Sequence, residues 1–305
     1  MLTAMATGAE PRPAALPLPG GREGATVRLQ PLLCGTWRWP PAALLREEGR
    51  FAWRKALGLG VPRSEFVLVP VQAFLVEHPR AGPILVDTGL HPSVAVDPKQ
   101  NLGRLLTLMS LRDVEMTPDQ AVPDQLRARG VDPAGVGVVV MTHLHADHAS
   151  AISEFPQATF VLSGAEWAAA TSQGQSHGYR RRQFDHAFDY RTLDFDGPDA
   201  DSFSAFGRAF DLFGDGTVRL VFTPGHTPGH LSVVLRVQRG EILLAGDAIY
   251  LERTLSDKHL PYAVEDEHLF RRSLREIELY ARETPDALVV PGHDIDAFRR
   301  LDPVY

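Results

Sequence analysis

The feature that most constrains this 305-residue chain is the segment THLHADH at residues 142–148, which directly follows the apolar run VGVVV. The segment places three histidines and one aspartate within six positions, at the end of a run that is typical of a buried strand. Such a cluster has little structural purpose without a metal ion, because imidazole and carboxylate groups are common ligands of divalent metals. The sequence therefore predicts a metal site at the carboxyl end of a strand.

Three further candidate ligands stand at the ends of other predicted strands. His226 lies in TPGHTPGH, Asp247 ends ILLAGD, and His293 follows LVVPG. Aligned sheets carry such strand ends to a common rim, so we expect these residues to converge on THLHADH although they are distant in sequence. Within the motif itself, an extended turn would point His143 and His145 the same way.

The number of candidate ligands indicates more than one metal ion. A catalytic zinc normally takes three protein ligands and a water, and this chain offers five histidines and two carboxylates. We therefore predict two divalent ions per chain, with zinc as the default and manganese, cobalt or iron as metals that the same donors accept. The simplest division gives one ion to His143, His145 and His226 and the other to Asp147, His148 and His293, with Asp247 bridging them.

Two neighbouring polar residues are candidates for supporting roles. Asp87 in LVDTG is either a turn residue at a strand end or a carboxylate that orients a ligating histidine. His230 stands four residues after His226, and we expect it to support or pack against the ligands because the ligand count is complete without it. The single cysteine, Cys34, excludes a site with several thiolates.

Composition and charge favour a small-molecule partner. The net charge of −7 offers no basic surface for nucleic acid or for a membrane. The N-terminal segment lacks the basic and apolar regions of a signal peptide, and no apolar stretch approaches the length of a membrane span. We expect a soluble cytoplasmic protein, and a homodimer is left open.

The pattern along the chain predicts one mixed domain behind a tail. Residues 1–25 are rich in Ala, Pro and Gly and indicate a flexible tail, whereas residues 26–305 indicate a single domain with two buried sheets. Residues 173–216 combine aromatic and polar side chains, as either a substrate cap or a helical insertion. Strands are predicted at 74–79, 83–89, 136–143, 158–164, 218–225, 231–237, 241–247 and 287–294. Helices are predicted at 119–129, after Asp147, at 164–171 and at 264–283, and a capping box from Ser163 to Glu166 precedes the third of these.

The motifs THLHADH, TPGHTPGH, GDA and PGHD, in this order and spacing, resemble those of the metallo-β-lactamase fold superfamily. The resemblance covers roughly residues 26–305 and implies an α+β fold, a four-layer αβ/βα sandwich with a dinuclear metal site at one edge of the two sheets. True β-lactamases of this fold lack the bridging aspartate, here Asp247, and diiron flavoproteins have a glutamate in place of His145. Nucleases of the fold would need a basic surface, and glyoxalase II enzymes share all seven ligands and stay an alternative.

Tyr250, three residues after Asp247 in GDAIY, resembles the tyrosine with which N-acyl-homoserine lactonases, the quorum-quenching branch, bind the lactone. This resemblance implies a hydrolase that opens lactone rings by attack of a metal-bridging hydroxide on the ester carbonyl. Tyr250 would then stabilise the oxyanion, and Asp147 would carry the proton to the leaving oxygen. Ala146 departs from the branch, since many such lactonases have an aromatic residue there, and acyl-chain contacts are expected to differ.

Three alternatives to the lactonase function stay open at this point. One is a glyoxalase II-like thioester hydrolase, and another is a broad esterase or phosphotriesterase of the same fold. The third is a metal-binding regulatory module without catalytic activity, although no ligand of the motif set is missing from this chain.

Overall fold

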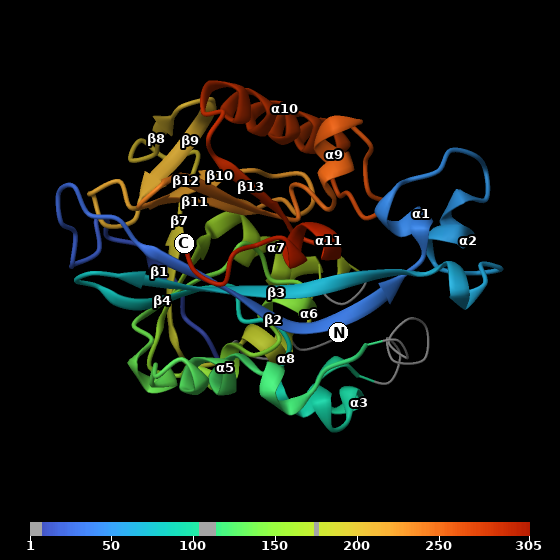
Figure 1. Cartoon of the computed structure of the whole chain (residues 1–305), viewed down its shortest axis with the longest axis horizontal. Coiled ribbons are helices and arrows are strands. Elements are labelled where there is room, and N and C mark those ends of the chain that lie inside the picture. Colours follow the sequence, from blue (N-terminus) through green and yellow to red (C-terminus); the bar gives the residue numbers. More distant parts are fainter. Residues whose placement is uncertain (1–7, 104–113, 174–176) are drawn as a thin grey trace.

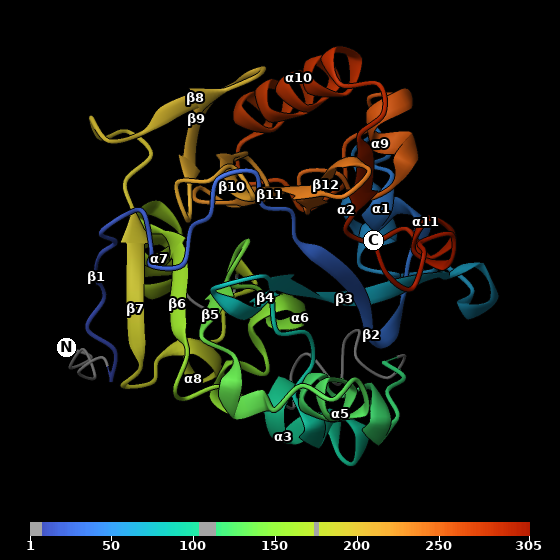
Figure 2. The same cartoon turned by 60° about the vertical axis from the view of Figure 1, so that its left-hand side comes forward.

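Two β-sheets stacked face to face form the centre of the molecule, and helices cover their outer faces. The computed structural model describes residues 8–103, 114–173 and 177–305. In Figures 1 and 2, α10 (Glu267–Glu283) lies over one sheet, while α3 (Pro98–Leu102) and α5 (Val122–Ala128) lie under the other. The expected four-layer αβ/βα sandwich is confirmed.

The first sheet has seven strands in the order β1-β7-β6-β5-β4-β3-β2. Neighbours from β1 through β4 in this order run parallel, and β3 is antiparallel to both β4 and β2. The strands are β1 (Arg12–Pro13), β2 (Arg28–Trp39), β3 (Val67–His78), β4 (Gly82–Val86), β5 (Val138–Val140), β6 (Thr159–Ser163) and β7 (Asp189–Leu193).

The second sheet has six strands in the order β13-β12-β11-β10-β9-β8. All neighbours are antiparallel except β12 and β13, so β10, β12 and β13 share one direction and end at the same edge. The strands are β8 (Asp201–Phe203), β9 (Phe206–Asp211), β10 (Val218–Phe222), β11 (Leu231–Val237), β12 (Gly240–Gly246) and β13 (Leu288–Pro291).

One hydrophobic core lies between the two sheets. It is built from β-branched and aromatic side chains that suit a pleated, buried surface, among them Val86, Val140, Phe222 and Val233. At the edge where β5 ends, the backbone N–H of Leu231 donates to the carbonyl of Thr142 at 3.0 Å. This bond joins the start of β11 in the second sheet to the THLHADH loop of the first.

The longest helix, α10, shows how an amphipathic segment closes the outer layer. Its buried residues Phe270, Leu274, Ile277 and Tyr280 recur every three or four positions and face the second sheet, as a helical period requires. Within the described ranges, no helix has the length and apolar character needed to cross a membrane. The other α-helices are α1 (Pro41–Leu44), α2 (Ala52–Ala56), α6 (Ala146–Ala149), α7 (Gly164–Gln173), α8 (Arg181–Phe184), α9 (Glu252–Ser256) and α11 (Ile295–Arg299).

Every apolar run predicted as a strand overlaps a strand of the structure, but five strands were not predicted. The longest of these, β2, contains Pro31 and Gly35, residues that normally argue against a strand interior. Pro31 pairs with Phe74 in regular register on this edge strand, and a register shift between Leu33 and Thr36 accommodates Gly35. The other missed strands are β1, β7, β8 and β9.

The N-terminal segment differs from the flexible tail that its composition predicts. Residues 8–25 run along the domain, where Arg12 pairs with Arg191 of β7 and the N–H of Leu18 donates to the carbonyl of Leu212 at 2.8 Å (Figure 2). Extended, proline-rich chain is compatible with a sheet edge because its missing N–H groups can face outward. Residues 1–7 of the expected tail lie outside the described residues.

The expected cap at residues 173–216 is divided between the two sheets. It supplies β7 to the first sheet and β8 and β9 to the second. Several of its aromatic side chains, such as Tyr190 and Phe206, are buried in the cores on either side. Residues 174–176 lie outside the described residues.

Shortening a side chain under α10 should weaken the whole fold. Ile277 is fully buried against the second sheet, so we expect Ile277→Ala to lower the free energy of unfolding by about 2–5 kcal/mol. Arg271→Ala on the exposed face of the same helix should change it by about 0.5 kcal/mol or less. Urea unfolding of both variants at equal metal content measures the difference, and equal values for the two would contradict this packing.

Candidate metal centre and active site

The candidate metal ligands lie just beyond the ends of four strands, in loops or, for Asp147 and His148, in the short helix α6. THLHADH follows β5 of the first sheet, whereas His226, Asp247 and His293 follow β10, β12 and β13 of the second. Because β10, β12 and β13 share a direction, their loops meet at one edge, and the Leu231–Thr142 bond holds that edge against β5. The structure thus brings together all seven residues singled out from the sequence.

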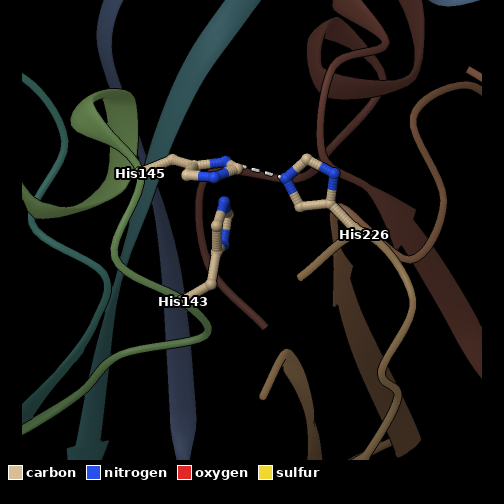
Figure 3. A group of neighbouring side chains, drawn as sticks. All are labelled: His143, His145 and His226. Carbon is tan, nitrogen blue, oxygen red and sulfur yellow. Dashed lines mark hydrogen bonds between the residues drawn. The ribbon is translucent and has the colours of Figure 1, made fainter. Parts of the chain in front are cut away.

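The first group consists of His143, His145 and His226. Their candidate ligand nitrogens lie within 4.8 Å of one another, and Figure 3 shows the three rings turned toward a common point. Nδ1 of His145 lies 2.9 Å from Nε2 of His226. This approach identifies Nδ1 of His145 and Nε2 of His226 as the atoms that face the site.

The second group consists of Asp147, His148 and His293, and Asp247 lies between the two groups. The ligand atoms of the second group also lie within 4.8 Å of one another. Oδ2 of Asp247 is 3.2 Å from Nε2 of His226, while Oδ1 is 3.1 Å from Nε2 of His293 and 3.4 Å from Nε2 of His148. Oδ2 also lies 3.3 Å from Nε2 of His293. The carboxylate therefore lies within reach of both groups, as a bridging ligand requires.

Each ring is oriented by a contact of its outer nitrogen. Imidazoles that bind metal usually donate their second N–H to a carbonyl or a carboxylate, which fixes both the tautomer and the ring direction. Nε2 of His145 lies 2.8 Å from the carbonyl of His177, Nδ1 of His226 lies 3.0 Å from the carbonyl of Ala263, and Nδ1 of His148 lies 2.7 Å from Oδ2 of Asp87.

Asp87 combines the two roles that its sequence context left open. Its φ of 58° is a turn conformation at the end of β4, and its carboxylate contacts His148 as described above. The same carboxylate accepts hydrogen bonds from the backbone N–H and the hydroxyl of Thr142, both at 2.8 Å. Asp87 therefore joins the strand end, the start of THLHADH and the ring of His148.

His230 is held by the protein at both ring nitrogens. Its Nε2 accepts the backbone N–H of Asp247 at 3.0 Å, and its Nδ1 lies 3.1 Å from the carbonyl of Thr223. With both nitrogens occupied in this way, His230 supports the loop that carries Asp247 and does not offer a ligand atom to the site.

Buried atoms without hydrogen-bond partners show that the site fits cations. Among the described residues, Nε2 of His143, Nε2 of His148 and Oδ1 of Asp247 are buried and make no hydrogen bond of acceptable geometry, although Oδ1 lies 3.1 Å from Nε2 of His293. A buried polar atom without a partner costs about 1–3 kcal/mol, and such atoms in a native fold call for an explanation. Divalent cations at the two groups would coordinate all three atoms.

The protonation states differ between the two ligand groups. Burial holds the pKa of His143 and of His226 well below the usual value, so both imidazoles keep a free lone pair at neutral pH. Burial alone would raise the pKa of Asp247, but His293, His226 and His148 hold it well below the usual range, so the carboxylate is ionised. Against the effect of burial, Asp147, Asp87 and Asp247 hold the pKa of His148 well above its usual value, and Asp247 and Asp147 raise the pKa of His293. Cations at the second group would therefore displace protons from these two rings, whereas the first group already offers neutral imidazoles.

A cavity of about 710 Å³ opens onto the metal centre. His145, Asp147, His226, Asp247 and Tyr250 form its inner wall. The remaining wall is largely apolar and includes Trp37, Trp39, Leu102, Tyr262 and Val264. The arrangement can hold a molecule with a polar reactive group at the metal centre and an apolar part beside it.

The sequence did not indicate which segments would form the cavity wall. Trp37 and Trp39 come from β2, a strand that was not predicted, and Tyr262 comes from the loop before α10. Of the aromatic stretch expected to line a channel, the described residues at the cavity are only His177 and Gly178. These assignments depend on long-range packing, and no short-range pattern could have revealed them.

Glu166 has a different role from the one its position suggests. It is three residues after Ser163, which is the spacing of a capping box, but its side chain turns inward. Its carboxylate accepts the backbone N–H of Leu144 at 2.9 Å and the hydroxyl of Thr227 at 2.6 Å. The pattern correctly predicted the start of a helix, since α7 begins at Gly164. It did not predict that Glu166 contacts Leu144 and Thr227.

Comparisons with known proteins agree with this site. The family model for the metallo-beta-lactamase superfamily matches residues 67–293. The chain is 36% identical over 234 residues to the N-acyl homoserine lactonase AttM of Agrobacterium fabrum, and this match covers 75% of this chain and 84% of that protein. It is 28% identical over 238 residues to an N-acyl homoserine lactonase of Bacillus sp, and this match covers 77% of this chain and 86% of that protein.

A solved structure shares the fold over nearly its whole length. An N-acyl homoserine lactone hydrolase, with the product N-hexanoyl-L-homoserine bound at its catalytic metal centre, superimposes on this chain with a TM-score of 0.72 at 21% identity. The match covers 91% of this chain and 97% of the other.

The position of Asp247 between the two groups generates a prediction about metal content. We expect about two metal ions per chain, and we expect Asp247→Asn to lose metal and nearly all activity because the bridging charge is removed. Elemental analysis of protein purified without chelator measures the metal content.

The control is Asp215→Asn, which changes a buried carboxylate paired with His78 at the opposite end of β10 and should keep its metal. A wild-type content of one ion with full activity, or normal metal content and turnover in Asp247→Asn, would contradict the dinuclear assignment.

Proposed function

Because this chain belongs to the metallo-beta-lactamase superfamily and, within it, to the branch of the N-acyl homoserine lactonases, we propose that it hydrolyses the ester bond of N-acyl homoserine lactones. The observation that carries the proposal is the meeting of two ligand groups, the Asp247 carboxylate between them and the Tyr250 side chain on one cavity wall. The residue roles given below are part of the proposal.

The seven side chains would hold two divalent cations, with zinc as the proposed metal. Bound there, the cations would lower the pKa of water and polarise the ester carbonyl. His143, His145 and His226 would hold one of them, Asp147, His148 and His293 the other, and Asp247 both. The protein itself contributes the placement of these donors and the groups that bind the substrate and move its protons.

Tyr250 is placed to donate a hydrogen bond to the carbonyl oxygen of the substrate. Burial, with Asp247 and Asp147 nearby, raises the pKa of Tyr250 well above its usual value, so the hydroxyl stays protonated. Its oxygen lies 3.2 Å from Nδ1 of His226. When Nε2 of His226 is a ligand, Nδ1 carries a hydrogen that the Ala263 carbonyl and the Tyr250 oxygen share. The Tyr250 proton, for which Asp247 is a neighbouring acceptor, would turn to a developing oxyanion.

Asp147 is placed to move a proton within the cavity. Its Oδ2 lies 3.6 Å from Nε2 of His293 and 3.8 Å from Nε2 of His148, and the side chain is partly exposed on the cavity wall. A carboxylate at this position can take a proton from the attacking water and deliver it to the alkoxide that leaves when the ring opens. The product is the N-acyl homoserine with a free carboxylate.

The cavity wall favours an uncharged substrate with an apolar tail. Among the described residues of the wall, Arg46 is the only arginine or lysine, and it is paired with Glu267 at 2.7 Å. A glutathione thioester carries several charges that would need cationic partners, whereas an acyl chain can lie along Trp37, Leu102 and Tyr262. This distribution of charge supports a lactone over a glutathione conjugate.

The proposed substrate class is tested with a panel of hydrolase substrates. In pH-stat assays we expect N-acyl homoserine lactones with short and long acyl chains to be cleaved with higher kcat/KM than γ-butyrolactone, S-lactoylglutathione, a β-lactam or paraoxon. γ-Butyrolactone has no acyl chain to contact the apolar wall of the cavity, so we expect a lower kcat/KM for it than for the acylated lactones. Faster cleavage of S-lactoylglutathione or paraoxon would replace the lactonase proposal with that activity.

Removing the hydroxyl of Tyr250 should weaken lactone hydrolysis without removing metal. We expect Tyr250→Phe to lower kcat/KM on a homoserine lactone by roughly tenfold to a hundredfold, because one of two groups that stabilise the oxyanion is lost. The effect on S-lactoylglutathione should be smaller. Kinetics on both substrates with metal analysis in parallel measures this difference.

Tyr280→Phe is the matched control, since it removes a buried tyrosine hydroxyl that donates to Glu241 on the far side of the second sheet. Its lactone kinetics should equal those of the wild type. If Tyr250→Phe also retained full lactone activity with its metal bound, Tyr250 would be a packing residue.

A further inference from the structure

Glu166 is a fully buried carboxylate that is not among the candidate ligands, yet it contacts both loops of the first ligand group. Oε1 accepts the backbone N–H of Leu144, and Oε2 accepts the hydroxyl of Thr227. Burying a carboxylate is costly, and these two hydrogen bonds offset part of that cost.

The two contacts lie directly beside the candidate ligands. Leu144 is the residue between His143 and His145, and Thr227 is the residue after His226. The first of these loops follows β5 of the first sheet and the second follows β10 of the second sheet. A single rigid carboxylate thus fixes the distance between two loops that belong to different sheets.

The close approach of α7 to this point depends on a glycine. A Cβ atom added at Gly229 would lie 2.0 Å from the backbone nitrogen of Glu166 and 2.4 Å from its Cα. No side chain fits in that space, so glycine at this position allows the first turn of α7 to pack against the His226 loop. The contact is therefore built into the backbone path as well as into the side chain.

We propose that Glu166 is a positioning residue for the metal centre. By accepting hydrogen bonds from both Leu144 and Thr227, it holds His143, His145 and His226 at the separation that a cation needs. The inference rests on the proposed metal centre and is independent of the lactone as substrate. Zinc–nitrogen bonds are about 2.0–2.1 Å long, so a shift of one loop against the other strains or breaks a bond at this group.

The proposal predicts weaker metal binding when either contact is removed. Glu166→Met keeps the length of the side chain but removes both acceptors, and Thr227→Val removes only the hydroxyl. We expect each to weaken binding of one of the two cations by roughly 10-fold to 100-fold, with the other little changed. Thr227→Ser keeps the hydroxyl and should bind like the wild type.

The measurement uses the full chain after metal removal, titrated with Zn²⁺ or Co²⁺ against a competing chelator. The d–d absorption of bound Co²⁺ reports ligand geometry and should change in Glu166→Met and Thr227→Val. Tyr280→Phe is the control for the loss of a buried hydrogen bond, and it should lower the melting temperature without changing metal affinity. Thr227→Val decides the question if Glu166→Met does not fold.

The outcomes separate this inference from the proposed function. Lower melting temperatures with wild-type affinity and Co²⁺ spectra in both variants would make Glu166 a purely structural residue and overturn the inference alone. A wild-type chain that binds no metal would overturn the metal centre and this inference together. Selective weakening of one cation, restored in Thr227→Ser, is the result that the proposal requires.

Discussion

The ionised carboxylate of Asp247 between two groups of imidazoles is the constraint on which the rest of the structure depends. Desolvation opposes the charge on Asp247, and only the surrounding histidines hold its pKa low. Buried nitrogens of His143 and His148 lack any partner within the described part of the chain. Cations bound at this cluster would coordinate these atoms, so binding energy at this centre would also be folding energy.

The two sheets hold the cluster through a set of buried polar contacts at their common edge. Leu231 bonds to Thr142 across the sheets, Asp87 joins Thr142 to His148, and Gln72 donates to the carbonyls of Pro291 and Gly292 at 2.9 and 2.6 Å, next to His293. Each contact holds a ligand-bearing segment on the side away from the cavity. The ligands can therefore be arranged on loops and still be held as precisely as residues within strands.

The cavity has a polar wall at the metal centre and an apolar wall beside it, and different parts of the chain form the two walls. The strand ends supply the metal centre and the Tyr250 side chain, whereas β2 and the segments around Leu102 and Tyr262 supply apolar surface. Chemistry and substrate selection are thus encoded in separate segments. The chemistry can be common to a whole superfamily while the apolar wall decides which ester reaches the centre.

The sequence alone determined the ligand cluster and most strands, because both depend on neighbours within a few residues: the spacing of THLHADH and the apolar runs ahead of His226, Asp247 and His293. The superfamily fold also followed from these motifs, and the structure and the comparisons confirm it. Only the tertiary structure decided the packing of residues 8–25, the division of residues 173–216 between two sheets, the wall of Trp37 and Trp39, and the inward turn of Glu166. These features depend on contacts between segments that are distant along the chain, which no local pattern of residues specifies.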